Sequence, residues 1–226
     1  AATKPTLIVS CFYPRRIPKA VLAIAPGINV HPSDLPRWRG PDPAYWAIRE
    51  GDKTTAICVH QLETGLDEGA ILFRELVEIR PRESGGALAI RMEARSAELV
   101  ADIALRMLAG ETFEPVPQTG EVTWAPLVDP DAVEIDWQQD AQAVHDFVRA
   151  ASPEPGAYTG IGDELLVIFS GTPVDAGPFA TLPPGTPYVR KGHSFVRCGG
   201  ASAYRLGWLR LGRKRMTGRQ LAKLLV

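Results

Sequence analysis

GINVHPSDLPRWRGPDP, residues 27–43, places a short apolar run directly before an irregular loop. The run Gly27–Val30 predicts a strand, and Asn29 and His31 stand at its end. The rest of the stretch holds four prolines, two arginines and one tryptophan, which excludes a regular helix there. A loop with only a structural role rarely needs an asparagine and a histidine two residues apart at its root. The stretch therefore marks a candidate functional site.

Strands and helices alternate on both sides of this stretch. Short β-rich apolar runs predict strands at Thr6–Ser10, Gly27–Val30, Thr54–Leu62 and Ala70–Ile79. Helices are predicted at Ile17–Ala25, with Pro18 in its first turn, at Pro43–Glu50 and at about residues 84–109, where apolar residues recur at helical spacing. This alternation predicts an α/β domain over residues 1–113.

A second domain is predicted after a proline-rich linker at residues 114–130. Asp140–Ser152 is predicted to form an amphipathic helix, because it begins at an aspartate and has an arginine near its end. Several short strands follow, interrupted by glycines and prolines. Residues 131–226 are therefore predicted to form a small β-barrel domain.

The composition is ordinary for a globular protein, with 45% hydrophobic and 23% charged residues. No apolar run approaches the roughly 20 residues of a membrane span, and no signal peptide is visible, so we expect no membrane association. Cys11, Cys58 and Cys198 lie far apart without CxxC spacing. This pattern predicts reduced cysteines in a cytoplasmic protein, without a zinc site or a disulfide framework.

The charge is distributed unevenly, although the net charge is only −1. No acidic residue follows Asp175, whereas ten lysines and arginines do. Such asymmetry favours a polyanionic partner. Alternatively, these cations balance the ten carboxylates between Asp129 and Asp175. Composition alone leaves both interpretations open.

Three polar residues are expected to meet at one edge of the first domain. Asn29 and His31 close a strand, and Asp67 lies in the glycine-flanked loop after the next one. Ligands of open α/β sheets bind at the carboxyl ends of strands. Amide and imidazole N–H groups can bind the oxyanion of acyl transfer, and a carboxylate can orient the imidazole. No serine or cysteine is placed as a nucleophile, which favours direct attack by the substrate. Alternatively, His31 caps a strand and Asp67 is a turn residue.

The blocks NVHPSDLPRWRGPDPAYWAIREGD and TGLDEGAIL resemble the formyltransferase family that uses 10-formyltetrahydrofolate. That family carries Asn-x-His-x-Ser-x-Leu-Pro-x-x-Arg-Gly followed by Leu-Asp-x-Gly. YPRRIPKAVL is similar to a segment of its folate pocket, and IDWQQDAQAVHDFVRAASPEPGAYT and GRKRMTGRQL are similar to the C-terminal domain of methionyl-tRNA formyltransferases. The resemblance implies a partial Rossmann-like formyltransferase domain followed by an OB-like barrel.

The resemblance also implies roles for individual residues. Asn29 and His31 would bind and polarise the formyl oxygen, and Asp67 would assist His31 and proton transfer. The co-substrate 10-formyltetrahydrofolate would be bound by Tyr13, Ile17, Pro18, Leu62, Gly65 and Leu66. The acceptor would be bound by Ser33, Arg39, Asp42 and His60. No metal is implied.

Two features distinguish the chain from methionyl-tRNA formyltransferases. The family has a further N-terminal half of the catalytic domain ahead of the point that matches Ala1, so we expect that a portion is omitted or removed. Pro41-Asp42-Pro43 and His60 are more similar to the branch that formylates amino sugars or amino-acid-derived metabolites, although alternation along its strand would also explain His60. We therefore favour a small amine as acceptor.

Initiator methionyl-tRNA is the alternative acceptor, because phosphate contacts would use the basic C-terminal residues. A formyltetrahydrofolate hydrolase and a non-catalytic binding module rank below both. The sequence leaves the oligomeric state open.

Overall fold

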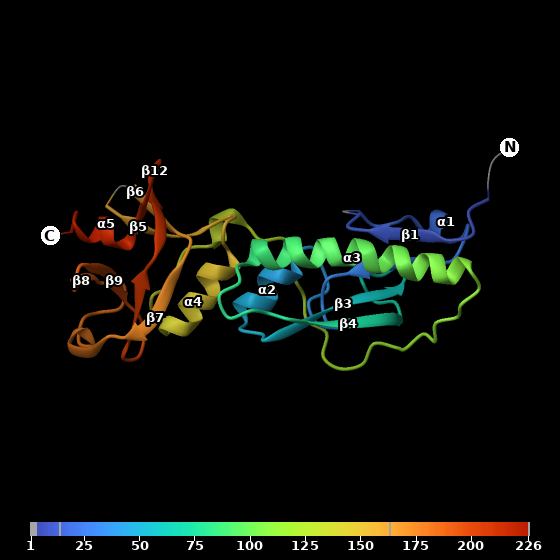
Figure 1. Cartoon of the computed structure of the whole chain (residues 1–226), viewed down its shortest axis with the longest axis horizontal. Coiled ribbons are helices and arrows are strands. Elements are labelled where there is room, and N and C mark those ends of the chain that lie inside the picture. Colours follow the sequence, from blue (N-terminus) through green and yellow to red (C-terminus); the bar gives the residue numbers. More distant parts are fainter. Residues whose placement is uncertain (1–3, 14, 163, 226) are drawn as a thin grey trace. The chain divides into compact units, whose positions relative to one another are not determined.

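The computed structural model describes residues 4–13, 15–162 and 164–225 (Figure 1). The chain divides into two compact units. Unit 1 comprises residues 1–47, 52–81 and 87–127, and unit 2 comprises residues 48–51, 82–86 and 128–226. Both units mix helices and strands, which confirms the α/β class that the sequence predicted.

Unit 1 contains a four-stranded sheet of order β1-β2-β3-β4. The strands are β1 (Ile8–Cys11), β2 (Gly27–His31), β3 (Thr54–Gln61) and β4 (Ile71–Glu78). β1 and β2 run parallel, whereas the β2–β3 and β3–β4 pairs are antiparallel. All four predicted strands are confirmed within two residues at each end, and β2 extends to include His31.

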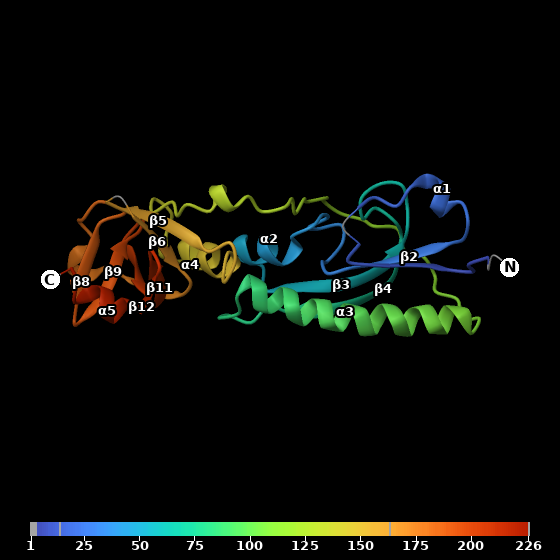
Figure 2. The ribbon, with the colours of Figure 1, turned by 90° about the horizontal axis from the view of Figure 1, so that it is seen from above.

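The helices of unit 1 are α1 (Lys19–Leu22), α2 (Pro43–Arg49) and most of α3 (Gly85–Leu108). Figure 2 shows α3 running along one face of the sheet beside β3 and β4. Leu88, Met92 and Ile103 of α3 are at most 1% exposed, as its helical spacing predicted. The helix predicted at Ile17–Ala25 is shorter than expected, and Pro18 is its N-cap rather than part of its first turn.

The stretch that the sequence analysis assigned to a linker pairs with β4 and with the loop that follows β2. Val116 exchanges two backbone hydrogen bonds with Ile71, of 2.8 and 2.9 Å. Further along, Arg39 donates to the carbonyl of Thr123 at 3.0 Å and accepts from the N–H of Ala125 at 2.8 Å. Residues 116–125, here named the strap, are thus anchored to unit 1 at both ends.

Unit 2 contains two open antiparallel sheets of four strands each, of order β7-β10-β9-β8 and β12-β11-β6-β5. The strands are β5 (Ala157–Ile161), β6 (Glu164–Ile168), β7 (Gly171–Asp175), β8 (Pro187–Arg190), β9 (His193–Arg197), β10 (Ser202–Leu206), β11 (Trp208–Leu211) and β12 (Lys214–Thr217). Among the described residues, no strand pairing joins the two sheets into the closed barrel that the sequence predicted.

Two helices complete unit 2, α4 (Ala141–Ala150) and α5 (Gly218–Ala222), along with short 3-10 turns at Pro130–Ala132 and Gly177–Phe179. Asp140 caps α4 by accepting from the N–H groups of its first turn, as expected for an aspartate at this place. Val144 and Val148 of α4 are at most 2% exposed, which confirms the amphipathic pattern.

Candidate active site

Asn29, His31 and His60 lie on one face of the sheet in unit 1. Side chains alternate across a strand, so Asn29 and His31, two residues apart on β2, share a face. The antiparallel register of β2 and β3 places Asn29 directly opposite His60. The amide Nδ2 of Asn29 is 3.1 Å from Nε2 of His60. Cross-strand pairing thus adds a second histidine to the two residues that the sequence motif marked.

Asp67 reaches this cluster from the loop between β3 and β4. Its backbone has φ +52°, a left-handed conformation that is unusual for a residue other than glycine. Gly69 makes the loop possible, because a Cβ atom there would stand 1.8 Å from the carbonyl oxygen of Gln61. A Cβ atom at Gly65 would likewise meet the Glu68 carboxylate at 1.9 Å. The Glu68 side chain is exposed and can move aside, whereas the Gln61 backbone cannot, so the loop geometry requires the glycine of the Leu-Asp-x-Gly motif, Gly69.

The carboxylate of Asp67 lies among four groups. Its Oδ2 is 3.5 Å from Nδ1 of His31 and accepts from the backbone N–H of Gly40 at 3.1 Å. Its Oδ1 is 3.4 Å from Nδ2 of Asn29 and 3.7 Å from Nε2 of His60. The structure therefore brings the three predicted catalytic residues, Asn29, His31 and Asp67, together with His60.

Backbone partners define the tautomers of both histidines. Nδ1 of His60 is 2.8 Å from the carbonyl oxygen of Gln61, so it carries the proton and donates. Nε2 of His60 is then the acceptor for the Asn29 amide. Nε2 of His31 is 2.9 Å from the carbonyl oxygen of Trp38 and donates to it. In the neutral ring, Nδ1 of His31 therefore presents a lone pair toward Asp67.

The electrostatics of the cluster keep His31 neutral and Asp67 ionised at neutral pH. Burial lowers the pKa of His31, and this effect outweighs the nearby charge of Asp67, which would raise the pKa. Burial would raise the pKa of Asp67, but its contacts with His60 and His31 and the hydrogen bond from the Gly40 N–H together hold the pKa below its ordinary value. The pair can therefore take up a proton.

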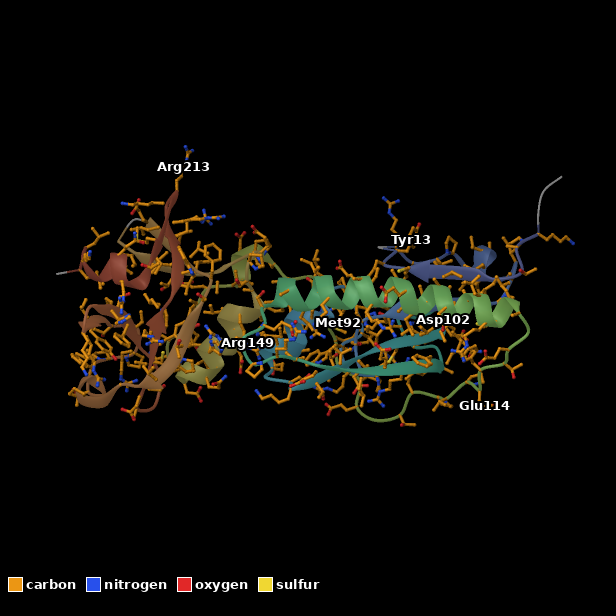
Figure 3. All side chains as sticks on the ribbon, viewed as in Figure 1. Tyr13, Met92, Asp102, Glu114, Arg149 and Arg213 are labelled. Carbon is orange, nitrogen blue, oxygen red and sulfur yellow. The ribbon has the colours of Figure 1, made fainter. Side chains whose placement is uncertain are left out.

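The residues expected to bind folate occupy two places. Leu62, Gly65 and Leu66 belong to the Asp67 loop, and Leu62 packs over Gly27, where a Cβ atom would stand 2.7 Å from the leucine. Tyr13, Ile17 and Pro18 follow β1. The parallel register pairs Cys11 with Val30, so Tyr13 lies just beyond the carboxyl end of β1, next to the end of β2. Tyr13, labelled in Figure 3, is 55% exposed.

Ser33, Arg39 and Asp42, which we expected to bind the acceptor, lie in the loop that follows β2. The hydroxyl of Ser33 donates to the carbonyl of Arg37 at 2.7 Å. The guanidinium of Arg39 donates to Oε1 of Gln118, and Asp42 directly precedes α2. Among the described residues, neither side chain forms a hydrogen bond with Asn29, His31, His60 or the Asp67 carboxylate. The contacts of Ser33 and Arg39 shape the loop, and binding of the acceptor by these residues stays a prediction.

Two further residues of this region were missed by the sequence analysis. Asp52 accepts from both Arg37 and the indole N–H of Trp38, at 2.9 and 2.7 Å. Gln118 contacts both loops that carry the cluster. Asp52 ends the quoted block that begins at Asn29, but no role was assigned to it, and Gln118 lies outside both blocks; their partners lie 14 to 79 residues away along the chain.

Unit 2 contains a cavity of about 430 Å³ with a strongly cationic lining. Its charged and imidazole residues are Arg82, His145, Arg149, His193, Arg205 and Arg219. Oδ1 of Asp146 is 2.7 Å from Nε of Arg149 and forms an ion pair with it. Among the described residues that line the cavity, none is an aspartate or a glutamate. Burial and the positive charges of Arg219 and Arg205 lower the pKa of His193, as expected where positive charge is in excess.

Two features are absent from the residues that the structure describes. No group of three or more His, Cys, Asp or Glu side chains is arranged to hold a metal ion. The helices found there are all too short or too polar to cross a membrane.

Family profiles match both units of the chain. The family described as "Formyl transferase" matches residues 1–103, and the family described as "Formyl transferase, C-terminal domain" matches residues 128–225. The chain therefore belongs to the formyl transferase family.

A methionyl-tRNA formyltransferase of Synechococcus sp. (strain JA-3-3Ab) is 37% identical over 179 residues, which are 77% of this chain and 55% of that protein. The chain thus spans little more than half the length of this relative.

Solved structures show the same fold at low sequence identity. HypX from Aquifex aeolicus, in complex with tetrahydrofolic acid, matches with a TM-score of 0.68 and 21% identity over 96% of this chain and 38% of its own. An N-formyltransferase from Helicobacter canadensis, in complex with folinic acid and dTDP-3-aminofucose, matches with a TM-score of 0.63 and 15% identity, over 79% of this chain and 65% of its own.

Proposed function

We propose that this chain carries the formyl-transfer site of an enzyme that moves the formyl group of 10-formyltetrahydrofolate to a primary amine. One observation carries the proposal: an ionised Asp67 between two imidazoles, beside an amide on the same sheet face. Such a cluster combines a hydrogen-bond donor for an oxyanion with a proton acceptor.

The amine nitrogen forms a bond to the formyl carbon, and the bond from that carbon to the folate nitrogen then breaks. The amine loses one proton and the leaving nitrogen gains one, so the reaction needs no further reactant. Asn29 would stabilise the oxyanion, since its 3.4 Å contact with Asp67 is long for a hydrogen bond and its N–H can turn to the substrate. His31 and Asp67 would take the amine proton at Nδ1 and Oδ2.

The loop between β3 and β4 fits the pterin ring of the co-substrate. Among the described residues, the backbone groups from Glu63 to Leu66 make no hydrogen bond with other backbone groups. They are therefore available to the donor and acceptor edge of a heteroaromatic ring. Leu62 and Leu66, the latter 39% exposed, would supply apolar contact with the ring faces.

Methionyl-tRNA is the acceptor that we now favour, which changes the preference reached from the sequence. A methionyl-tRNA formyltransferase is 37% identical to this chain, whereas the N-formyltransferase solved with dTDP-3-aminofucose is 15% identical. The cationic cavity of unit 2 fits the phosphate groups of an RNA. We further propose that the two sheets of unit 2 correspond to the OB-like barrel that the resemblance implies for the C-terminal domain.

An amino sugar or another small amine is the second candidate. His60 favours it, because it places a second imidazole within 3.1 Å of Asn29, at a position where the resemblance leads us to expect methionine in the tRNA enzymes. We further propose a cytoplasmic location, which the three free cysteines support.

The decisive experiment is mass spectrometry of products after incubation with 10-formyltetrahydrofolate. The acceptors are charged initiator tRNA and a panel of amino sugars and amino-acid-derived amines. Formylated methionyl-tRNA would support both the formyl transfer and the favoured acceptor. A formylated sugar or other small amine would support the formyl transfer with the second candidate as acceptor. Release of formate alone, with no formylated amine, would refute it. His31→Ala should abolish transfer while the circular dichroism spectrum stays that of the unchanged protein.

A further inference from the structure

The carboxamide of Gln118 joins the two loops that hold Asp67. Its Nε2 donates to the carbonyl oxygens of Asp67 and Gly69, both at 2.8 Å. Its Oε1 accepts from Nε and an Nη atom of Arg39, at 3.2 and 2.7 Å. A carboxamide offers two donors and two acceptor sites, so all four are used. Gln118 is half-buried, whereas its neighbours Pro117 and Thr119 are exposed.

These four contacts act on both sides of the Asp67 carboxylate. The backbone of Asp67, at φ +52°, needs outside support because the left-handed conformation is unfavourable for an aspartate. Gln118 supplies support through the main-chain carbonyl of Asp67 itself. On the other side, Arg39 directly precedes Gly40, whose N–H binds Oδ2 of Asp67. The Gln118 side chain therefore holds both the backbone of Asp67 and, through Arg39, the neighbouring Gly40 whose N–H binds the Asp67 carboxylate.

We propose that Gln118 is a positioning residue that sets the carboxylate of Asp67 against His31 and His60. The inference rests on the proposed formyl transfer, and it assigns a role to a residue outside every motif of the chain. Gln118 acts through Asp67 and does not itself contact the reacting groups.

The strap allows this role to be separated from folding. Backbone hydrogen bonds to Ile71 and Arg39 anchor the strap at Val116 and at Thr123 and Ala125, on either side of Gln118. None of these bonds involves the Gln118 side chain. Substitution of Gln118 should therefore leave the strap in place and alter only the contacts of the carboxamide.

Two substitutions distinguish the functions of the carboxamide. Gln118→Met keeps its length and removes all four hydrogen bonds. Gln118→Glu keeps the acceptor for Arg39 but loses both donors and places a negative charge beside two carbonyl oxygens. Thr119→Glu is the matched control, because it adds the same charge one position away on an exposed side chain.

The kinetic test compares kcat and KM of formyl transfer over a range of pH. A misplacement of about 1 Å costs on the order of 100-fold in rate, so both Gln118 variants should lose kcat by roughly 10- to 100-fold, with KM changed much less. The acid limb of the pH profile should also move toward neutral pH, because a displaced Asp67 loses the contacts that hold its pKa down. Thr119→Glu should retain the kcat and the pH profile of the unchanged protein.

Ring nitrogen signals in ¹H–¹⁵N NMR spectra give a readout that does not depend on activity. The signals of His31 and His60 should shift in Gln118→Met and Gln118→Glu and stay in place in Thr119→Glu. Unaltered ring signals with unaltered kcat in both Gln118 variants would overturn the inference. If the unchanged protein transfers no formyl group, the proposed function fails, and the ring signals then decide separately whether Gln118 positions Asp67.

Discussion

Asp67→Asn separates the charge of this residue from its shape. The substituted side chain keeps an oxygen for the Gly40 N–H, now 3.1 Å from Oδ2, and fits the same space. Its new amide would take the position of Oδ1, which is 3.7 Å from Nε2 of His60, so it does not block Nδ1 of His31. The variant therefore removes the negative charge that stabilises a proton on the pair, while the His31 imidazole stays in place.

The expected loss follows from general base catalysis, which contributes roughly 10²- to 10⁴-fold in rate, or about 3 to 5 kcal/mol. Single-turnover kinetics with saturating 10-formyltetrahydrofolate measures the chemical step directly. The melting temperature should change by roughly 4 °C or less, since shape and most contacts are retained. Glu68→Gln is the control, an exposed carboxylate next in the chain that should keep its rate within about twofold. A rate for Asp67→Asn within about threefold of the unchanged protein would refute proton uptake by this pair.

Three other predictions follow from the geometry. Transfer should persist at pH 6.5, the ordinary histidine pKa, and fail only at lower pH, because burial lowers the pKa of His31 and transfer needs a neutral His31 and an ionised Asp67. His31 and Asp67 bind fewer protons in the folded than in the unfolded protein, because folding lowers both pKa values. The free energy of unfolding, measured by urea denaturation, should therefore decrease as pH falls below the ordinary pKa of each group. A free energy of unfolding that increases on acidification would contradict this. Gly69→Ala should prevent the Asp67 loop from closing, because the new methyl would meet the Gln61 carbonyl; an unchanged melting temperature and kcat would exclude this. Arg205→Glu with Arg219→Glu should weaken tRNA binding and reduce its salt dependence by up to about two phosphate contacts, while formylation of a small amine stays unchanged; equal tRNA affinity would remove the cavity from the RNA site.

The strands and long helices of unit 1 could be predicted from local sequence. Apolar runs of four to eight residues and helical recurrence of Leu88, Met92 and Ile103 are local patterns, and each yields the element found. The short helix begins at Lys19, two residues later than expected, because Pro18 is its N-cap; it ends at Leu22, and none of its residues is buried. In unit 2, glycines and prolines predicted many short strands, but pairing into two open sheets is a property of the whole unit.

The acceptor site shows the limit of motif reasoning. Ser33 and Arg39 belong to the motif, and sequence resemblance implied that they bind substrate. The hydroxyl of Ser33 donates to the Arg37 carbonyl and the guanidinium of Arg39 donates to Gln118, contacts that shape the loop, while substrate binding by both residues stays a prediction. A motif does not distinguish residues that contact the substrate from residues that hold its loop.

The sequence by itself determined which residues share a strand face. The alternation of side chains places Asn29 and His31 on one face of the strand, and the motif marked Asp67 and the glycine at 69 that its loop requires. The tertiary structure decided how these residues contact one another and that His60 and Gln118 join them. His60 arrives through the register of β2 and β3 from 31 residues away, Asp67 from 38, and Gln118 lies 51 residues beyond Asp67 on the strap. Such contacts depend on strand pairing and loop closure across the whole unit, which no local pattern encodes.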